Sequence, residues 1–403
     1  MYDLLKGLRV VEGSAFIAGP TCGLYLAQMG AQVIRFDNIA GGPDFRRWPL
    51  AQNGSSLYWE GLNKAKKSVA LDLSRPEGRE LAQRLAAAPG EAGGLFVTNF
   101  PAEGFLAYER LKALRDDLIC VRVMGWADGG PGVDYTINAA VGVPQMTGPT
   151  DDDRPVNHVL PAWDLLTGAY AAFTLVSALL DRRTSGRGRE IRIPLSDIAA
   201  ATLANMGMTA EAALGGHQRA RHGNDLYGAF GRDFVTRGGQ RIMLVAITPR
   251  QWKGVLAVLG IAEPVAALEA ELACDFVADE GQRFAHRDRL FPLFEQAFAA
   301  RDLAELAPVF EADGVCWGPY QPLETAMADP RLFAGNPIFS DLTHPSGQTY
   351  PAAGAAATIP QDVRGPARPA ARLGQHTDEV LAEVLGMSGA EIARLHDAGI
   401  VAG

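Results

Sequence analysis

The sequence predicts an α/β protein with a parallel β-sheet and a second, smaller α+β domain. Three observations predict this fold. Short apolar runs alternate with segments of helical periodicity in the first third of the chain, a pattern typical of a parallel sheet with both faces covered. The chain has 403 residues, too many for one small core. A pair of strand-like runs around two glycines then interrupts the pattern near the middle of the chain.

The elements of the larger part follow in order. Residues 8–11 predict a short buried strand, and a helix runs from Gly19 to about Met29, where Gly30 ends it. The same alternation then repeats several times. The further predicted strands are 31–36, 94–98, 118–123 and 190–194, and the further predicted helices are 76–88, 108–114, the segment from Asp164 to about 186, and 196–214.

The middle of the chain has a different organisation. The runs 228–235 and 241–246 flank a glycine turn, and helical segments dominate from there to about residue 312. We therefore predict a small α+β domain over residues 220–325 and a large domain over 1–219 and 326–403. Within the last segment, the proline- and alanine-rich stretch 351–371 predicts an extended linker, followed by short helices at 377–385 and 388–398.

Composition excludes several classes of protein. The net charge of −9 argues against nucleic acid as a partner, because phosphate binding needs a basic surface. The four cysteines form no CxxC pair, which argues against a zinc site or a disulfide framework and favours a reducing compartment. No signal-peptide pattern begins the sequence, and the most apolar helical run, 169–180, is too short to span a bilayer. We expect a cytoplasmic protein with no membrane partner.

The early strand–helix–strand pattern also occurs in dinucleotide-binding proteins, in which Asp37 would hold a ribose. The first turn, residues 12–20, lacks the GxGxxG spacing that lets a pyrophosphate approach the backbone. The sequence therefore disfavours a nicotinamide or flavin enzyme.

Asp164 has two interpretations. It lies directly before an apolar-periodic helix, so it is a candidate N-cap. It is also a candidate carboxylate nucleophile, which is compatible with capping, since the positive end of a helix dipole keeps a carboxylate ionised. Local sequence leaves both interpretations open.

Three other segments are candidate binding elements. Lys64, Lys66 and Lys67 form a basic cluster that indicates either a solvated turn or a grip on phosphates. Asn99-Phe100 follows a buried strand at its carboxyl end, the edge where open α/β sheets bind ligands.

The third segment, Tyr227 to Arg232, contains Gly228 and Gly231. It reads either as a bulged strand edge or as a loop whose backbone N–H groups stabilise an oxyanion while Arg232 meets a carboxylate.

Taken in order, these pieces resemble the family III CoA-transferases over almost the whole chain. The matching runs are 5–12, 18–20, 30–37, Leu62-Asn63, 66–72, Asn99-Phe100, Asp164 with Gly168, 183–188, 227–230 and 373–377.

The resemblance implies a Rossmann-like large domain made from both ends of the chain, a small middle domain, and a homodimer with interlocked subunits. It places the catalytic carboxylate at Asp164 and implies a CoA thioester as the small-molecule substrate, with neither a metal nor a redox cofactor. The residues expected to hold CoA are Ala18, Leu62, Asn63, Lys66, Asn99 and Phe100. Those expected to contact the acid or its oxyanion are Tyr227, Gly228, Gly231, Arg232, His158 and Asn157.

Longer runs, among them 10–16, 157–164 and 226–234, are similar to members of the family that move CoA between the two carboxyls of one C5 dicarboxylic acid. The alternatives are an intermolecular transferase and a CoA-ester-binding protein that has lost catalysis. Formyl-CoA transferases have polar or basic residues at or near the positions of Ile17, Asn38 and Met124. Some of the contacts that bind CoA must therefore differ.

Racemases of the family carry Gly-His-Asp, and this chain has Gly132-Val133-Asp134. The missing histidine argues against racemisation, because that reaction needs two proton-transfer groups.

Overall fold

The computed structural model describes residues 1–216 and 219–403, and the chain forms two units. The first comprises Met1–Val141, His158–Leu214 and Gly335–Gly403, and the second comprises Gly142–Asn157 and Gly215–Ala334. The units differ from the predicted domains, since the second unit already begins at Gly215 in its main segment. Residues 142–157 belong to the second unit, and that unit extends to Ala334.

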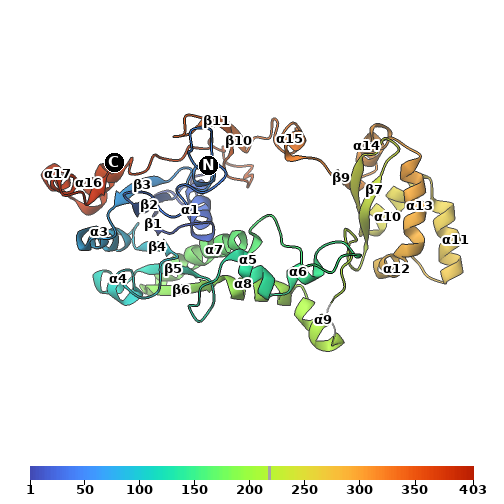
Figure 1. Cartoon of the computed structure of the whole chain (residues 1–403), viewed down its shortest axis with the longest axis horizontal. Helices are drawn as coiled ribbons and strands as arrows, with labels where there is room; N and C mark the ends of the chain where they lie inside the picture. The colour runs from blue at the N-terminus through green and yellow to red at the C-terminus, as the bar shows by residue number, and fades with distance from the viewer. Residues whose placement is uncertain (217–218) are drawn as a thin grey trace. The chain divides into compact units, whose positions relative to one another are not determined.

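A seven-stranded sheet forms the centre of the first unit, in the order β12-β3-β2-β1-β4-β5-β6 (Figure 1). Strands β1 to β6 run parallel, and β12 pairs antiparallel with β3. The predicted α/β fold with a mostly parallel sheet is confirmed. The strand order is that of doubly wound sheets. Strands β1 to β3 are added toward one edge, and strands β4 to β6 are added toward the other edge, so the order reverses between β1 and β4. The strands are β1 (Arg9–Gly13), β2 (Gln32–Asn38), β3 (Lys67–Leu71), β4 (Leu95–Thr98), β5 (Ile119–Met124), β6 (Arg189–Pro194) and β12 (Val401–Ala402).

Helices cover both faces of this sheet. Because side chains alternate along a strand, neighbours such as Val10 and Val11 enter different cores. Val10 packs in a core that includes residues of α1 (Ala18–Gln28) and α7 (Ala162–Ser185). Val11 packs in the other core, which includes residues of four further helices. Those helices are α3 (Pro76–Ala86), α4 (Tyr108–Leu114), α16 (Thr377–Leu385) and α17 (Gly389–Asp397).

The end of the chain returns to the first unit. Strand β12 joins the sheet beside β3, and α16 contacts α3, as the red and blue ribbons in Figure 1 show. Strands β10 (Phe339–Thr343) and β11 (Thr349–Ala353) form an antiparallel hairpin within the same unit. The predicted linker at 351–371 therefore begins inside a strand.

Several elements differ from the prediction. Strand β3 was not predicted, because its first residue belongs to the lysine cluster that was read as a turn or phosphate grip. The helix predicted at 196–214 is two helices, and Gly207 between them has a φ of +77°, a conformation that glycine adopts without strain. The remaining helices of this part are α2 (Leu57–Leu62), α5 (Asp134–Ala140), α8 (Leu195–Asn205) and α9 (Met208–Gly215).

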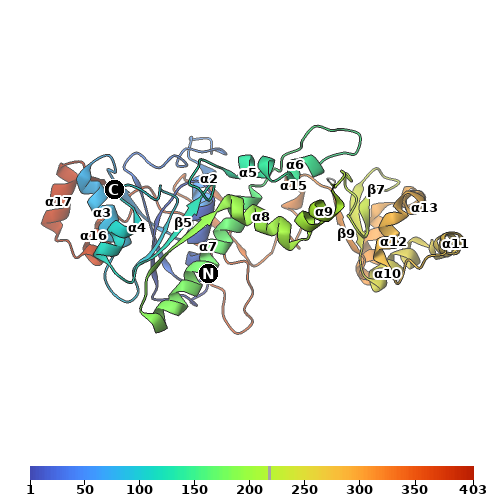
Figure 2. The same ribbon diagram turned by 90° about the horizontal axis from the view of Figure 1, so that it is seen from below.

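Helix α7 is 24 residues long, so the prediction of a run too short to cross a bilayer was wrong. Within residues 1–216 and 219–403 it is the one helix that is long and apolar enough for a membrane span. Core helices of globular proteins meet the same criterion. Helix α7 packs against α1 and β5 in the first unit, and Figure 2 shows it beside β5.

The second unit is built on a three-stranded antiparallel sheet of β7 (Phe230–Val235), β8 (Arg241–Ala246) and β9 (Cys316–Pro319). Its core is aromatic, and the rings of Phe230 and Phe294 lie 4.4 Å apart between centroids. The helices of this unit are α6 (Val143–Met146), α10 (Pro249–Leu259), α11 (Ala262–Leu272), α12 (Glu280–Ala285), α13 (Arg287–Ala299), α14 (Leu303–Ala312) and α15 (Leu323–Ala326).

Candidate active site

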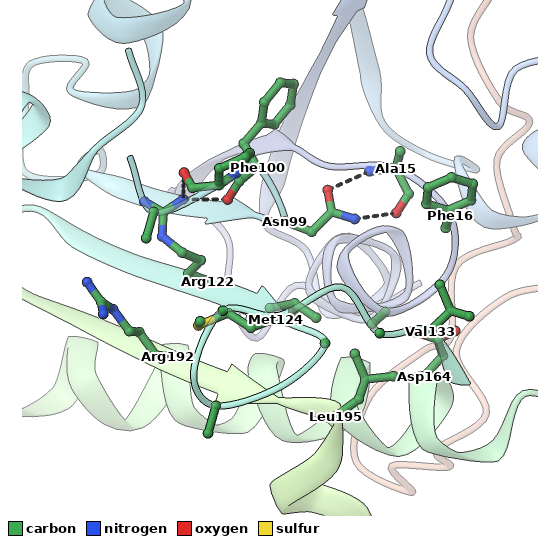
Figure 3. A pocket seen from close by; sticks show the side chains of 18 of the residues that line it. Ala15, Phe16, Asn99, Phe100, Arg122, Met124, Val133, Asp164, Arg192 and Leu195 are labelled. Atoms are coloured by element: carbon green, nitrogen blue, oxygen red, sulfur yellow. Dashed lines mark hydrogen bonds between the residues drawn. The ribbon is translucent and has the colours of Figure 1, made fainter. Parts of the chain in front are cut away.

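A cavity of about 670 Å³ lies at the carboxyl edge of the parallel sheet, around the point where the strand order reverses. The loops that follow β1 and β4 form one part of its wall, and the residues that follow β5 and β6 form another. This edge is where doubly wound sheets bind ligands, because loops diverge there to either side. Ala18, Asn99 and Phe100, three of the residues predicted to hold CoA, line this cavity together with Asp164. Figure 3 shows Asn99, Phe100 and Asp164.

Asp164 lies in the first turn of α7, at the third helical position after the N-cap residue Pro161. The interpretation of Asp164 as the N-cap is wrong. The cap is supplied by Asp134 of α5, whose Oδ2 accepts hydrogen bonds from the backbone N–H of Trp163 at 2.7 Å and of Asp164 at 3.1 Å. The Asp164 carboxylate is therefore not used for capping, and it lines the cavity.

The surroundings of Asp164 shift its acidity in the opposite direction to the helix-dipole prediction. Burial and, to a smaller extent, the charge of Asp134 raise the pKa of the Asp164 carboxyl to about 7, while Arg47 acts against both. A carboxyl with this pKa is partly ionised near neutral pH and is more basic than an ordinary aspartate. Such a group is suited to covalent catalysis, in which it must both attack and leave.

His158 pairs with the capping carboxylate. Its Nε2 lies 2.5 Å from Oδ1 of Asp134, and its ring centroid lies 6.4 Å from that of Trp163. The sequence predicted a substrate contact for His158. His158 is not among the residues that line the cavity, and its ring contacts the carboxylate that caps α7.

The loop after β1 is fixed by side chains from other elements. The amide of Asn99 holds both polar groups of Ala15, accepting from its N–H at 3.1 Å and donating to its carbonyl at 2.9 Å. Asp44 accepts the N–H of Phe16 at 3.0 Å, and Phe16 has a φ of +69°. These contacts shape the wall of the cavity beside Asp164.

Gly168 lets α7 approach α1. A Cβ at this position would lie 2.7 Å from the carbonyl oxygen of Ala18 and 2.7 Å from Cβ of Thr21. Gly168 follows Asp164 by about one helical turn, so this close approach sets where Asp164 stands relative to the loop that holds Ala18.

Lys66, Asn63 and Leu62 lie outside the cavity wall. The ammonium of Lys66 is buried, 2.8 Å from Oε2 of Glu12, and donates to the carbonyl of Pro20 and to Oδ1 of Asn63. Its charge is thus engaged inside the protein. Sequence reasoning assigned this lysine to a phosphate because Glu12, its partner, is 54 positions away in the chain.

Arg35 joins the same buried group of charges. Its guanidinium forms a two-pronged ion pair with Asp37 and also contacts Asp44 and Asn63. Since Asp44 also holds Phe16, the network connects the centre of the sheet to the cavity wall.

The predicted oxyanion loop belongs to the second unit, where Gly228 has a φ of +78° and the Leu226 N–H donates to the Gly231 carbonyl at 2.8 Å. Tyr227 packs edge-on against Phe284. Arg232 lies over the ring of Phe291 and pairs with two carboxylates, Glu295 at 3.3 Å and Asp225 at 3.8 Å.

Asn157 closes the first segment of the second unit. The structure describes these residues within their own unit, and their roles stay predictions.

Sequence reasoning missed four residues of the site. Asp134 was noted only as part of a motif that lacks its histidine. Arg122 and Arg192 line the cavity, and both pair with Glu190. Arg47 acts on Asp164 and was not considered, although a double arginine at 46–47 beside a tryptophan was a visible signal.

Comparison with known proteins places these features in context. The family model described as CoA-transferase family III matches residues 5–377. The chain is 48% identical to a 2-methylfumaryl-CoA isomerase of Chloroflexus aurantiacus, over 100% of this chain and 99% of that protein. It is 29% identical to a succinate–glutarate CoA-transferase of Agrobacterium fabrum, over 94% of this chain and 95% of that protein. A crystal structure of a CaiB/BaiF family protein from Brucella suis has a TM-score of 0.75 and 26% identity, covering 94% of this chain and 99% of that one.

Proposed function

This chain belongs to CoA-transferase family III, and from that premise we propose that it moves CoA within one molecule, from the C1 to the C4 carboxyl of mesaconate (2-methylfumarate). One observation carries the chemistry: the carboxylate of Asp164 faces a cavity at the ligand-binding edge of the sheet, with a pKa near neutrality. The identity of 48% over the whole chain supports the choice of acid.

The first half of the reaction breaks the C1 thioester. The Asp164 carboxylate attacks the thioester carbonyl, the carbon–sulfur bond breaks, and CoA leaves as a thiolate. The product is a mixed anhydride between Asp164 and mesaconate. The thiolate then attacks the aspartyl carbonyl and displaces mesaconate as a carboxylate, which leaves CoA on Asp164 as a thioester.

The second half repeats these steps from the other end of the acid. The C4 carboxylate of the retained mesaconate attacks the aspartyl thioester and releases the thiolate. The thiolate attacks the C4 carbonyl of the new anhydride, which gives the C4 thioester and frees Asp164. No proton is gained or lost over the cycle. Because each step is an acyl transfer, the site must exclude water, which would hydrolyse the anhydride.

Two groups of residues would assist this chemistry. The proposed CoA site is the cavity wall formed by Ala18, Asn99 and Phe100, and the supporting observation is that these three residues line the cavity together. Each tetrahedral oxyanion needs donors, and the backbone N–H groups of Gly228 to Gly231 are the proposed source.

The same proposal includes a cytoplasmic homodimer with interlocked subunits. The feature that supports association is an exposed apolar row on α7. Its members, spaced to share one face of the helix, are Leu166, Tyr170, Phe173 and Leu180. Light scattering on the purified protein tests this part, and a monomer at micromolar concentration would exclude it.

The second candidate is an intermolecular transferase, which the similarity to a succinate–glutarate CoA-transferase favours. The two candidates differ in what they need. We expect purified protein to convert mesaconyl-C1-CoA into the C4 ester with no added acid, as chromatography would show. Turnover of succinyl-CoA that depends on added glutarate, without conversion of mesaconyl-C1-CoA, would favour the second candidate.

A further inference from the structure

Arg47 packs against Phe16, which lines the same cavity as Asp164. Its guanidinium carbon is 5.7 Å from the centre of the Phe16 ring and 5.4 Å from the centre of the Tyr58 ring. Phe16 lines the same cavity as Asp164, and Figure 3 shows both toward one end, with Arg122 and Arg192 toward the other. Two aromatic faces thus keep a cation beside the candidate nucleophile.

Hydrogen bonds anchor the backbone of Arg47 on both sides of its Cα, which fixes the point from which its side chain extends. The Arg47 N–H donates to the carbonyl of Asp44 at 3.1 Å, and the hydroxyl of Ser56 donates to the carbonyl of Arg47. Ser56 is also the N-cap of α2, the helix that carries Tyr58. The loop and the helix that flank the guanidinium are therefore tied together by one residue.

Within the part of the chain that the structure describes, no carboxylate neutralises the charge of Arg47. Arg122 and Arg192, the other arginines of this region, both pair with Glu190. Across residues 1–216 and 219–403, the guanidinium of Arg47 forms no ion pair with a carboxylate.

The neighbouring Tyr58 hydroxyl is buried and makes no hydrogen bond within the described part of the chain. A cation and a hydroxyl donor thus stand together beside Asp164.

We infer that Arg47 is a specificity-determining residue that binds the free carboxylate of the dicarboxylic acid while the other carboxyl is joined to CoA or to Asp164. This inference rests on the proposed function. The planar guanidinium of Arg47 can hold a carboxylate through two parallel hydrogen bonds. The region is otherwise unfavourable for an anion, because Asp134 and Asp164 are themselves acidic.

One cation suffices for both ends of the substrate. In the C1 thioester the free group is the C4 carboxylate, and in the C4 thioester it is the C1 carboxylate. When mesaconate is fully displaced, Arg47 can hold either carboxylate while the other faces the aspartyl thioester. A grip on a free carboxylate also explains how the acid stays bound between the two halves of the reaction.

Arg47 takes the role that the sequence assigned to Arg232 and His158. Both of those residues have carboxylate partners in their own surroundings, Arg232 with Asp225 and Glu295, and His158 with Asp134. The positive charge of Arg47, in contrast, lowers the pKa of Asp164.

The test compares Arg47→Gln, Arg47→Lys and the matched control Arg46→Gln. Arg46 is the adjacent arginine; both side chains are exposed, and Arg46 lines a different cavity. Each protein is incubated with mesaconyl-C1-CoA and isotopically labelled mesaconate, and both thioesters are followed by chromatography and mass. We expect Arg47→Gln to isomerise about 100-fold more slowly and to admit label into the thioester pool, since the acid escapes. Arg47→Lys should recover part of the rate, and Arg46→Gln should match the unmodified protein.

Arg47 also lowers the pKa of Asp164, so the assay is repeated at pH 9, where Asp164 is ionised in every variant. A defect that persists at pH 9 supports carboxylate binding. A defect that disappears there, or an Arg47→Gln enzyme that retains full rate without exchange of label, overturns the inference. Failure of the unmodified protein to isomerise overturns the proposed function instead, so the two failures are distinguishable.

Discussion

Asp134 and Asp164 meet at the first turn of α7, where Oδ2 of Asp134 accepts the backbone N–H of Asp164 at 3.1 Å. The same carboxylate that caps the helix also places a negative charge beside the Asp164 side chain and raises its pKa. Capping and tuning of the nucleophile are thus done by one residue of another helix. This relationship gives the proposed mechanism a pH dependence.

The rate of isomerisation should fall as the pH drops through about 7, because burial and Asp134 raise the pKa of Asp164 to that value and only the ionised form attacks. Asp134→Asn removes one cause of the raised pKa, while its amide oxygen can still accept from the helix. The acidic limb of the pH–rate profile should therefore move to lower pH. The other charged or titratable groups around the pair are Arg47, Tyr58 and His158. A limb that does not move would show that another group titrates.

Asp164→Asn should lower the rate by about 1,000-fold or more, because an amide is a far weaker nucleophile than a carboxylate.

The Asp164→Asn variant should also be more stable than the unmodified protein at pH 8. The folded-state pKa of Asp164 is raised above its unfolded value, so folding binds a proton and stability falls as pH rises from about 4 toward 7. The amide removes this loss.

Thermal unfolding of the two proteins at pH 5 and pH 8 measures that effect. The advantage of Asp164→Asn should be larger at pH 8. Equal differences at both pH values would mean that Asp164 is ionised throughout this range.

Gly168→Ala should displace α7 from α1, because its Cβ would lie 2.7 Å from the Ala18 carbonyl oxygen. We expect a loss of about 1–3 kcal/mol in the free energy of unfolding and a lower rate, since Asp164 moves with the helix. Gly389→Ala is the matched control, as a Cβ there meets no atom within 4 Å. Denaturant titration and the isomerase assay report the two effects, and a Gly168→Ala protein with normal rate would contradict this account of the helix contact.

Two adjacent lysines should respond differently to substitution by methionine. Lys66→Met leaves Glu12 buried without its ammonium partner and should cost about 3–5 kcal/mol of stability. Lys67→Met removes a surface pair with Glu379 and should cost about 0–1 kcal/mol. Urea denaturation of both variants measures the difference. If Lys66→Met were as stable as Lys67→Met and bound CoA esters poorly, Lys66 would serve as a phosphate contact after all.

The sequence predicted what depends on local pattern. Strand–helix alternation gave the α/β class, and the position of Asn99 after a buried strand indicated the ligand edge, because both signals lie within a few residues. The cap on α7 could not be predicted in this way, since Asp134 reaches it from 30 residues earlier. The ion pair of Lys66 could not be predicted for the same reason, because its partner is a distant glutamate inside the sheet. Arg47 acquires its role only when Phe16 and Tyr58 are brought around it.

The measurement that tests the central claim most directly is exchange of free acid during turnover by the unmodified protein. Mesaconyl-C1-CoA is incubated with an excess of isotopically labelled mesaconate, and the mass of each thioester is followed as the C4 ester forms. Intramolecular transfer predicts that the C4 ester appears without label, because the displaced acid never leaves the site. Label in the thioesters at the rate of their interconversion would contradict the claim and identify an intermolecular transferase.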